Sequence, residues 1–168
     1  VEESRLGPLT FGPQRENRLF VLGDAKSGKS TFLRTIAHEV MHRQAAPEAQ
    51  LFVVDLRRSL LGEIPDEYLA GYLTTREQAA SELGGLAEYL RKRLPPNDVT
   101  PEQLRTRSWW HGAEAWVLVD DYDLVATQTG NPLDSLQPLL AQATDVGLHI
   151  ILARRMGGAG RALYQSVM

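Results

Sequence analysis

Short runs of apolar residues, each followed by a glycine or a charged residue, mark the strands that this sequence predicts. Such runs are typical of strands buried on both faces of a parallel sheet. They occupy residues 19–22, 51–54, 115–119 and 148–153, and a weaker run covers residues 70–74. Before the first of them, residues 1–17 form a lead-in broken by glycine and proline, in which we expect a short edge strand near Leu9 to Phe11.

Helical periodicity fills the segments between these runs. Helices are expected over residues 28–43, over 75–94, from Pro101 onward and over 131–147. The first has one apolar stripe at helical spacing, made by Phe32, Leu33, Ile36, Ala37 and Val40. The last begins with an Asn131-Pro132 cap and stops at Gly147. Because strands and helices alternate, we predict an α/β fold with a mainly parallel sheet flanked by helices.

Composition narrows the class of protein. The chain has 168 residues, 43% hydrophobic and 23% charged, which fits one globular domain of ordinary size. It has no cysteine, so disulfides and thiolate zinc sites are excluded. A net charge of −3 gives no global attraction to nucleic acid, so we do not expect DNA as a partner. No apolar run approaches the roughly 18 to 20 residues that cross a bilayer.

The stretch GDAKSGKS at residues 23–30 matches the phosphate-binding pattern G-x-x-x-x-G-K-[ST], and it lies between a predicted strand and a predicted helix. Gly23 and Gly28 allow the backbone to turn so that successive N–H groups point at phosphates. Lys29 is expected to reach the terminal phosphates of ATP, and the Ser30 hydroxyl to bind Mg²⁺. The predicted nucleotide-binding residues are Gly23, Asp24, Ala25, Lys26, Ser27, Gly28, Lys29, Ser30 and Thr31.

Two carboxylates follow the strand at residues 115–119. We expect Asp120 to bind the magnesium ion and Asp121 to polarise the attacking water. P-loop motors usually carry Asp followed by Glu here, and an aspartate is shorter by one methylene group. Its carboxylate would fall about 1 Å short, an error that can cost on the order of 10²-fold in rate. We therefore predict slow or conditional hydrolysis, with Lys29, Asp120 and Asp121 as the catalytic residues.

The stretch HEVMH at residues 38–42 matches the H-E-x-x-H pattern of zinc metalloproteases. At about 100° per residue, His38 and His42 lie nearly opposite the apolar stripe of their helix. No third ligand is evident in the sequence. We therefore interpret this stretch as a helix face turned to solvent or to a neighbouring subunit.

Four further pairs of residues have predicted roles in packing, in an interface or beside the nucleotide. Trp109-Trp110 precede a strand and are predicted to pack rather than to grip a partner. Arg57-Arg58 follow the second strand, as a solvated turn or as part of a subunit interface or phosphate sensor. Arg154-Arg155 end the last strand and are candidate sensors of the terminal phosphate. Tyr122-Asp123 are expected to fix the loop after Asp121.

Several stretches together resemble a known family. GDAKSGKST, VLVDDYD and GLHIILARR resemble the motor domains of the FtsK/SpoIIIE type. VVDLRRSLLG, DDYDLV and GGAGRALY look more specifically like the EccC-type ATPases of type VII (ESX) secretion systems. The similarity spans residues 5–166. It implies a three-layer ASCE-type (RecA-like) P-loop fold, in which the strand at 148–153 separates the nucleotide-loop strand from the Asp120 strand. Two positions depart from the motor pattern, since Asp121 replaces Glu and Arg154-Arg155 replace Thr-Gln.

The resemblance also implies a cellular setting. Such modules form a ring, expected to be hexameric, at the cytoplasmic face of a membrane complex, and the membrane is met only through that parent complex. The implied partners are other ATPase modules of the same chain or ring and small helical secreted proteins. On this reading residues 1–168 are one module, excised from a longer chain or incomplete at its C-terminus, and they look most like a later module.

Three hypotheses follow for the function. The main one is an ATP-binding module of a type VII secretion motor, in which MgATP binding and slow hydrolysis regulate recognition and export of secreted proteins. The second is a non-hydrolysing module that holds nucleotide and serves as a docking platform for secreted partners. The third is a DNA translocase module of the FtsK type, which the acidic charge balance disfavours.

Overall fold

A computed structural model of the chain describes residues 17–156. The edge strand expected near Leu9 to Phe11 and the GGAGRALY stretch lie outside the described residues. Within the described part, no helix is long and apolar enough to span a membrane.

Five strands form one sheet in the order β1-β5-β4-β2-β3, and every neighbouring pair is parallel. Their bounds are β1 Arg18–Leu22, β2 Ala49–Val54, β3 Leu69–Leu73, β4 Glu114–Val119 and β5 Leu148–Arg154. The prediction of a mainly parallel sheet is confirmed. So is the place of the last strand, because β5 pairs with β1 on one side and with β4 on the other.

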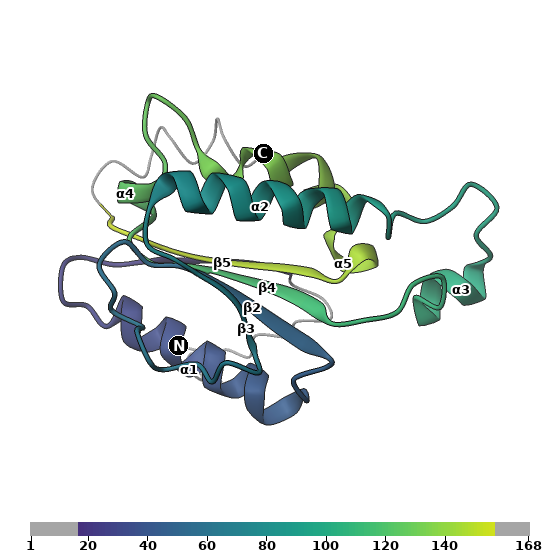
Figure 1. Ribbon diagram of the computed structural model, residues 1–168, viewed down its shortest axis with the longest axis horizontal. Helices are drawn as coiled ribbons and strands as arrows, with labels where there is room; N and C mark the ends of the chain where they lie inside the picture. The colour runs from purple at the N-terminus through teal and green to yellow at the C-terminus, as the bar shows by residue number, and fades with distance from the viewer. Residues whose placement is uncertain (1–16, 157–168) are drawn as a thin grey trace, which may run out of the picture.

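Helices cover both faces of the sheet and complete three layers (Figure 1). Helix α1 (Lys29–Arg43) lies on one face, where Leu33, Ala37 and Val40 join a core with β2, β4 and β5. Phe32, expected in the same apolar stripe, is instead exposed. Helices α2 (Arg76–Arg91) and η1 (Pro132–Gln142) pack together on the other face. The short helices are α3 (Pro101–Thr106), α4 (Tyr122–Val125) and α5 (Ala143–Val146).

The helix after Asn131 begins as predicted but is not an α-helix along most of its length. The Asn131 side chain accepts a hydrogen bond from the N–H of Leu133, and Pro132 occupies the first turn. The segment then runs as a 3₁₀-helix with Pro138 inside it. A proline lacks the N–H that an α-helical turn needs, which favours this irregular geometry. Gly147 ends the following α5 turn with a left-handed φ of 71°.

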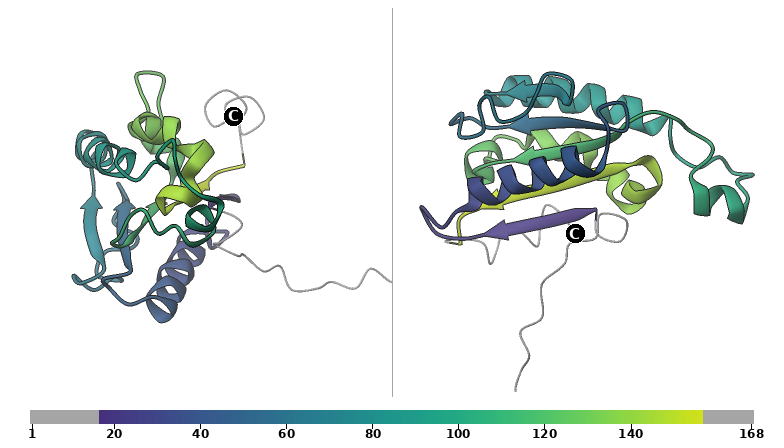
Figure 2. Two further views of the ribbon diagram at one scale, coloured as in Figure 1. Left: turned by 90° about the vertical axis from the view of Figure 1, so that its right-hand side faces the viewer. Right: turned by 90° about the horizontal axis from the view of Figure 1, so that it is seen from below.

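The segment around α3 projects beyond the amino ends of the strands, at the end of the sheet opposite the phosphate loop (Figures 1 and 2). The two indoles anchor its return to the body. Trp109 donates a hydrogen bond to the carbonyl of Arg93, and Trp110 donates one to the carbonyl of Asp145, each at 2.7 Å. The guanidinium of Arg93 stacks 4.1 Å from the ring centre of Trp110. The prediction that the tryptophans pack is thus confirmed.

Candidate functional site

The loop from Gly23 to Gly28 joins the carboxyl end of β1 to the first turn of α1. Gly28 precedes the helix with a left-handed φ of 88°. This conformation is unfavourable for residues that carry a Cβ and nearly free of strain for glycine. Gly23 is favoured for a different reason: a Cβ placed there would come within 2.3 Å of the Ser27 hydroxyl and 3.1 Å of its Cβ, so the Ser27 side chain would have to shift. The N–H of Gly23 also donates to the carbonyl of Arg154 at 3.1 Å, which ties the loop to β5.

The side chain of Lys29 reaches back to the start of this loop. Its ammonium donates a hydrogen bond of 2.7 Å to the carbonyl of Asp24, and the residue is only 8% exposed. Residues 24–28 are exposed. The loop therefore holds a buried cation beneath a turn of backbone at the N-terminus of a 15-residue helix, an arrangement suited to a polyanion.

Ser30 and Asp120 meet although they lie 90 positions apart in the sequence. The Ser30 hydroxyl donates a 2.5 Å hydrogen bond to Asp120 Oδ2. Asp120 directly follows β4 and is 2% exposed, so the fold keeps a carboxylate buried beside the loop. A hydroxyl and a carboxylate side by side are hard oxygen donors of the kind that Mg²⁺ prefers.

Asp121 forms an ion pair with an arginine, a contact that the sequence does not predict. Its Oδ2 lies 3.1 Å from Nε of Arg57, which follows β2. Strands β2 and β4 are neighbours, with Val54 opposite Val119, so the two strand ends bring these side chains together. Arg57 is half exposed and pairs with a carboxylate of the candidate site; a role in a subunit interface or in phosphate sensing stays a prediction.

Asp123 links the loop after β4 to the end of β5. One carboxylate oxygen accepts a hydrogen bond from Nε of Arg154 at 2.8 Å, and the other accepts one from the backbone N–H of Arg155 at 2.9 Å. Tyr122 accepts a hydrogen bond from the Asn131 amide at 2.9 Å. Both residues thus fix this loop, as expected. Arg154 meets the carboxylate of Asp123, while the side chain of Arg155 is exposed.

The HEVMH stretch lies on α1 with His38 and His42 on its exposed face, in the register that the sequence predicts. Nε2 of His38 lies 3.8 Å from a carboxylate oxygen of Glu63, which also pairs with Arg34. Among residues 17–156 no cluster of three or more His, Cys, Asp or Glu side chains has a geometry that could hold a metal ion.

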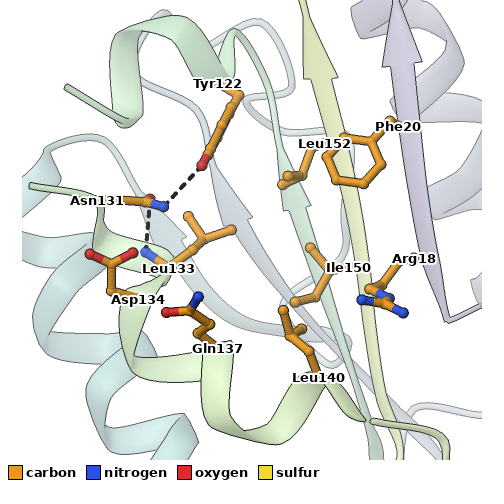
Figure 3. A pocket seen from close by; sticks show the side chains of 10 residues that line it. All are labelled: Arg18, Phe20, Tyr122, Asn131, Leu133, Asp134, Gln137, Leu140, Ile150 and Leu152. Atoms are coloured by element: carbon orange, nitrogen blue, oxygen red, sulfur yellow. Dashed lines mark hydrogen bonds between the residues drawn. The ribbon is translucent and has the colours of Figure 1, made fainter. Parts of the chain in front are cut away.

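A small pocket lies on the far side of the sheet from α1, between β1, β5 and η1 (Figure 3). Its walls are mostly apolar and include Phe20, Leu133, Ile150 and Leu152. Tyr122, the residue after Asp121, forms one end. The residues of the phosphate loop do not line this pocket, so it is distinct from the site around Lys29.

A second polar cluster, which sequence reasoning missed, occupies the amino end of the sheet. His149 is buried, stacks on Trp116 with ring centres 4.0 Å apart, and places Nε2 3.1 Å from Glu114 Oε2. Burial would raise the pKa of Glu114, but hydrogen bonds from His149, Gln44 and Arg107 outweigh it and lower that pKa to about 2. A histidine inside an apolar strand needs a buried hydrogen-bond partner, so His149 was the residue from which this cluster could have been predicted.

The sheet order, the glycine-bounded loop after β1 and the strand-end aspartate together define a P-loop NTPase module. No protein-family profile matches the chain. Over its whole length the chain is 44% identical to the ESX-4 secretion system protein EccC4 of Mycobacterium tuberculosis, and it spans 14% of that protein.

Solved structures give the same relationship. The cytoplasmic domain of the type VII secretion ATPase EccC of Thermomonospora curvata superposes with a TM-score of 0.92 at 45% identity, over 96% of this chain and 19% of that one. A structure of ATPases 2 and 3 of the same protein, in complex with a signal sequence peptide, matches with a TM-score of 0.91, also at 45% identity, over 96% and 29%. The resemblance to EccC-type ATPase modules is thereby confirmed, and relatives of this kind imply a nucleotide as ligand.

Proposed function

We propose that this chain is a MgATP-binding module of a type VII secretion motor, which hydrolyses ATP slowly or only under particular conditions. The observation that carries the proposal is the 2.5 Å hydrogen bond between Ser30 and Asp120. It joins the serine of the phosphate loop to the strand-end carboxylate, the two oxygen donors that a P-loop site needs for magnesium.

Each part of the loop has a role in this proposal. The backbone N–H groups between Gly23 and Thr31 hold the phosphates, aided by the N-terminus of α1. Lys29 leaves the Asp24 carbonyl and pairs with the terminal phosphates. Ser30 and Asp120 hold the magnesium ion, which when bound offsets the charge of the phosphates. Asp121 orients the attacking water, at a position where the shorter aspartate makes turnover slow.

Support for the cellular setting comes from the relatives. A chain that contains only ATPases 2 and 3 of EccC matches as well as the longer cytoplasmic domain does, which favours a later module of a multi-module protein. We propose that the module works with other ATPase modules in a ring at the cytoplasmic face of a membrane complex. By analogy with the peptide-bound EccC structure, we propose that its substrates carry a signal sequence. The family resemblance implies that they are small helical secreted proteins.

Calorimetric titration of the chain with MgATP tests the proposal. Binding is expected in the parent chain and in Lys92→Ala, an exposed lysine at the end of α2, and is expected to be lost in Lys29→Ala. A thermal scan gives a second readout, because ligand at 100 times Kd adds about 2.7 kcal/mol. That corresponds to a rise in Tm of roughly 5 to 10 °C. Equal binding by Lys29→Ala would contradict the assignment of the loop.

The second candidate function is the non-hydrolysing docking platform, and one observation favours it. Asp121, the residue assigned to water, is paired with Arg57. Turnover by the ring assembled with its neighbouring modules separates the two functions. Hydrolysis that depends on Asp121 supports the motor module, whereas tight MgATP binding with no turnover supports the platform.

A further inference from the structure

The ion pair between Arg57 and Asp121 lies beside the candidate site, and surrounding contacts fix the orientation of both partners. The carboxylate of Asp121 is 18% exposed, while the side chain of Arg57 is 51% exposed. The carboxylate end of the pair is therefore largely withdrawn from water. An interaction on that side is screened less than one between two fully exposed side chains.

The turn that carries Arg57 is fixed by a buried carboxylate. Asp55 directly follows β2 and is 1% exposed. Its two oxygens accept hydrogen bonds from the N–H groups of Arg57, at 3.2 Å, and Leu60, at 2.7 Å. The Tyr72 hydroxyl donates a third, at 2.6 Å. Burial and this hydrogen bond raise the pKa of Tyr72, so the phenol keeps its proton and remains a donor.

The backbone on both sides of the pair is held in an uncommon conformation. Asp121 has φ 45°, and Arg58, the residue after Arg57, has φ 60°. Left-handed backbone costs a non-glycine residue roughly 1–2 kcal/mol and persists where surrounding contacts impose it. For Asp121 one such contact is its own N–H, which donates to Asp120 Oδ1 at 2.9 Å. Each partner is thus oriented by its own strand end.

From these contacts we propose that Arg57 is a positioning residue that holds Asp121 away from the attacking water and keeps the module in a nucleotide-holding state. The proposal rests on the proposed function. In hydrolysis, the water oxygen bonds to the γ-phosphorus and the bond to the β–γ bridging oxygen breaks. The water proton passes to the Asp121 carboxylate, and ADP and phosphate leave. The pairing of Oδ2 with the guanidinium holds the carboxylate in one orientation, so the side chain must leave Arg57 before it can turn toward the water.

Steady-state hydrolysis and MgATP affinity of the chain are compared in Arg57→Gln, Arg57→Lys, Arg57→Gln/Asp121→Asn and the matched control Arg58→Gln. Arg57→Gln is expected to raise kcat by about tenfold, because general-base catalysis contributes on the order of 10²–10⁴-fold. The Kd for MgATP should not change. Arg57→Lys, which keeps the charge, should return kcat toward the parent value. The double variant should lose the gain, and Arg58→Gln should match the parent.

Each other outcome has a distinct meaning. An unchanged kcat in Arg57→Gln with intact MgATP binding overturns the inference and leaves the proposed function standing. A tenfold weaker Kd in Arg57→Gln also overturns it, since Arg57 would then be a ligand of the nucleotide. A gain that survives Asp121→Asn excludes action through that carboxylate. Failure of the parent chain to bind MgATP overturns the proposed function itself.

Discussion

Ser30 and Asp120 form a hydrogen bond across an intervening strand, since β5 lies between the strand that leads into the loop and the strand that Asp120 directly follows. The hydroxyl is thus held by the first turn of α1 and the carboxylate by the end of β4, and both are oriented before any ligand arrives. Such preorganisation lowers the cost of forming a coordination site.

Asp120→Asn should therefore weaken the magnesium-dependent part of nucleotide binding. Metal affinity is expected to fall by about 10- to 100-fold, the range seen when the groups that orient or bind a metal are changed. Titrations with ATP, with and without magnesium, measure this. Asp134→Asn, on the exposed side of η1, is the control. A loss of affinity that is the same with and without magnesium would show that Asp120 does not act through the metal.

Asp121→Glu should raise turnover, because the longer side chain restores the reach of the usual glutamate. If Arg57 restrains the carboxylate, adding Arg57→Gln should increase the gain by more than the two separate effects combined, as expected for residues in contact. ATP hydrolysis by the four members of this double-mutant cycle gives the coupling. An Asp121→Glu rate equal to that of the parent would refute the explanation based on reach.

Arg93→Ala should destabilise the fold. This arginine is 4% exposed, donates to the carbonyls of Ala113 and Val146, and stacks on Trp110. Truncation leaves buried acceptors without a partner and removes packing, at a cost of about 2–3 kcal/mol. Urea unfolding measures the loss. Arg91→Ala, an exposed position in the last turn of α2, should change the free energy of unfolding by less than about 0.5 kcal/mol.

Glu114 should make the fold sensitive to acid. Its pKa is lowered to about 2 in the folded chain, against an ordinary value of 4.5. A carboxyl group whose pKa is lower in the folded chain than in the unfolded chain stabilises the fold at pH values above its unfolded-state pKa. This stabilisation is lost as the pH falls toward its folded-state pKa. The free energy of unfolding should therefore fall between about pH 5 and pH 2, and less steeply in Glu114→Gln. Equal slopes in urea titrations over this range would contradict the assignment.

The sequence predicts the helices and strands better than the contacts between the loops that follow the strands. Apolar runs and helical stripes are local signals, so β1, β4, β5 and α1 were expected close to their observed bounds. Pro138 was a visible local signal of an irregular helix and was overlooked. The pairing of Arg57 with Asp121 has no local signal, because it depends on how two loops leave neighbouring strands.

The burial of charged side chains could not be predicted from the sequence either. Arg93 belongs to an RKR stretch at a helix end, which in sequence is indistinguishable from a solvated terminus. Its environment is made by Tyr89 and by Trp110, a residue brought back only when the projecting segment returns to the body. The position of β5 in the sheet followed from the family resemblance, since periodicity predicts that a strand exists and not which strands it joins.

The central place of β5 has a consequence for how the site comes into being. Adjacent strands lie about 4.8 Å apart, so β1 and β4 are held at roughly twice that spacing only while another strand fills the gap. A polypeptide emerging from the ribosome and ending before Leu148 would already contain Lys29, Ser30, Asp120 and Asp121, yet the hydroxyl and the carboxylate would not be held in register. In the proposed function, the site can therefore hold nucleotide only once β5 has been inserted between β1 and β4.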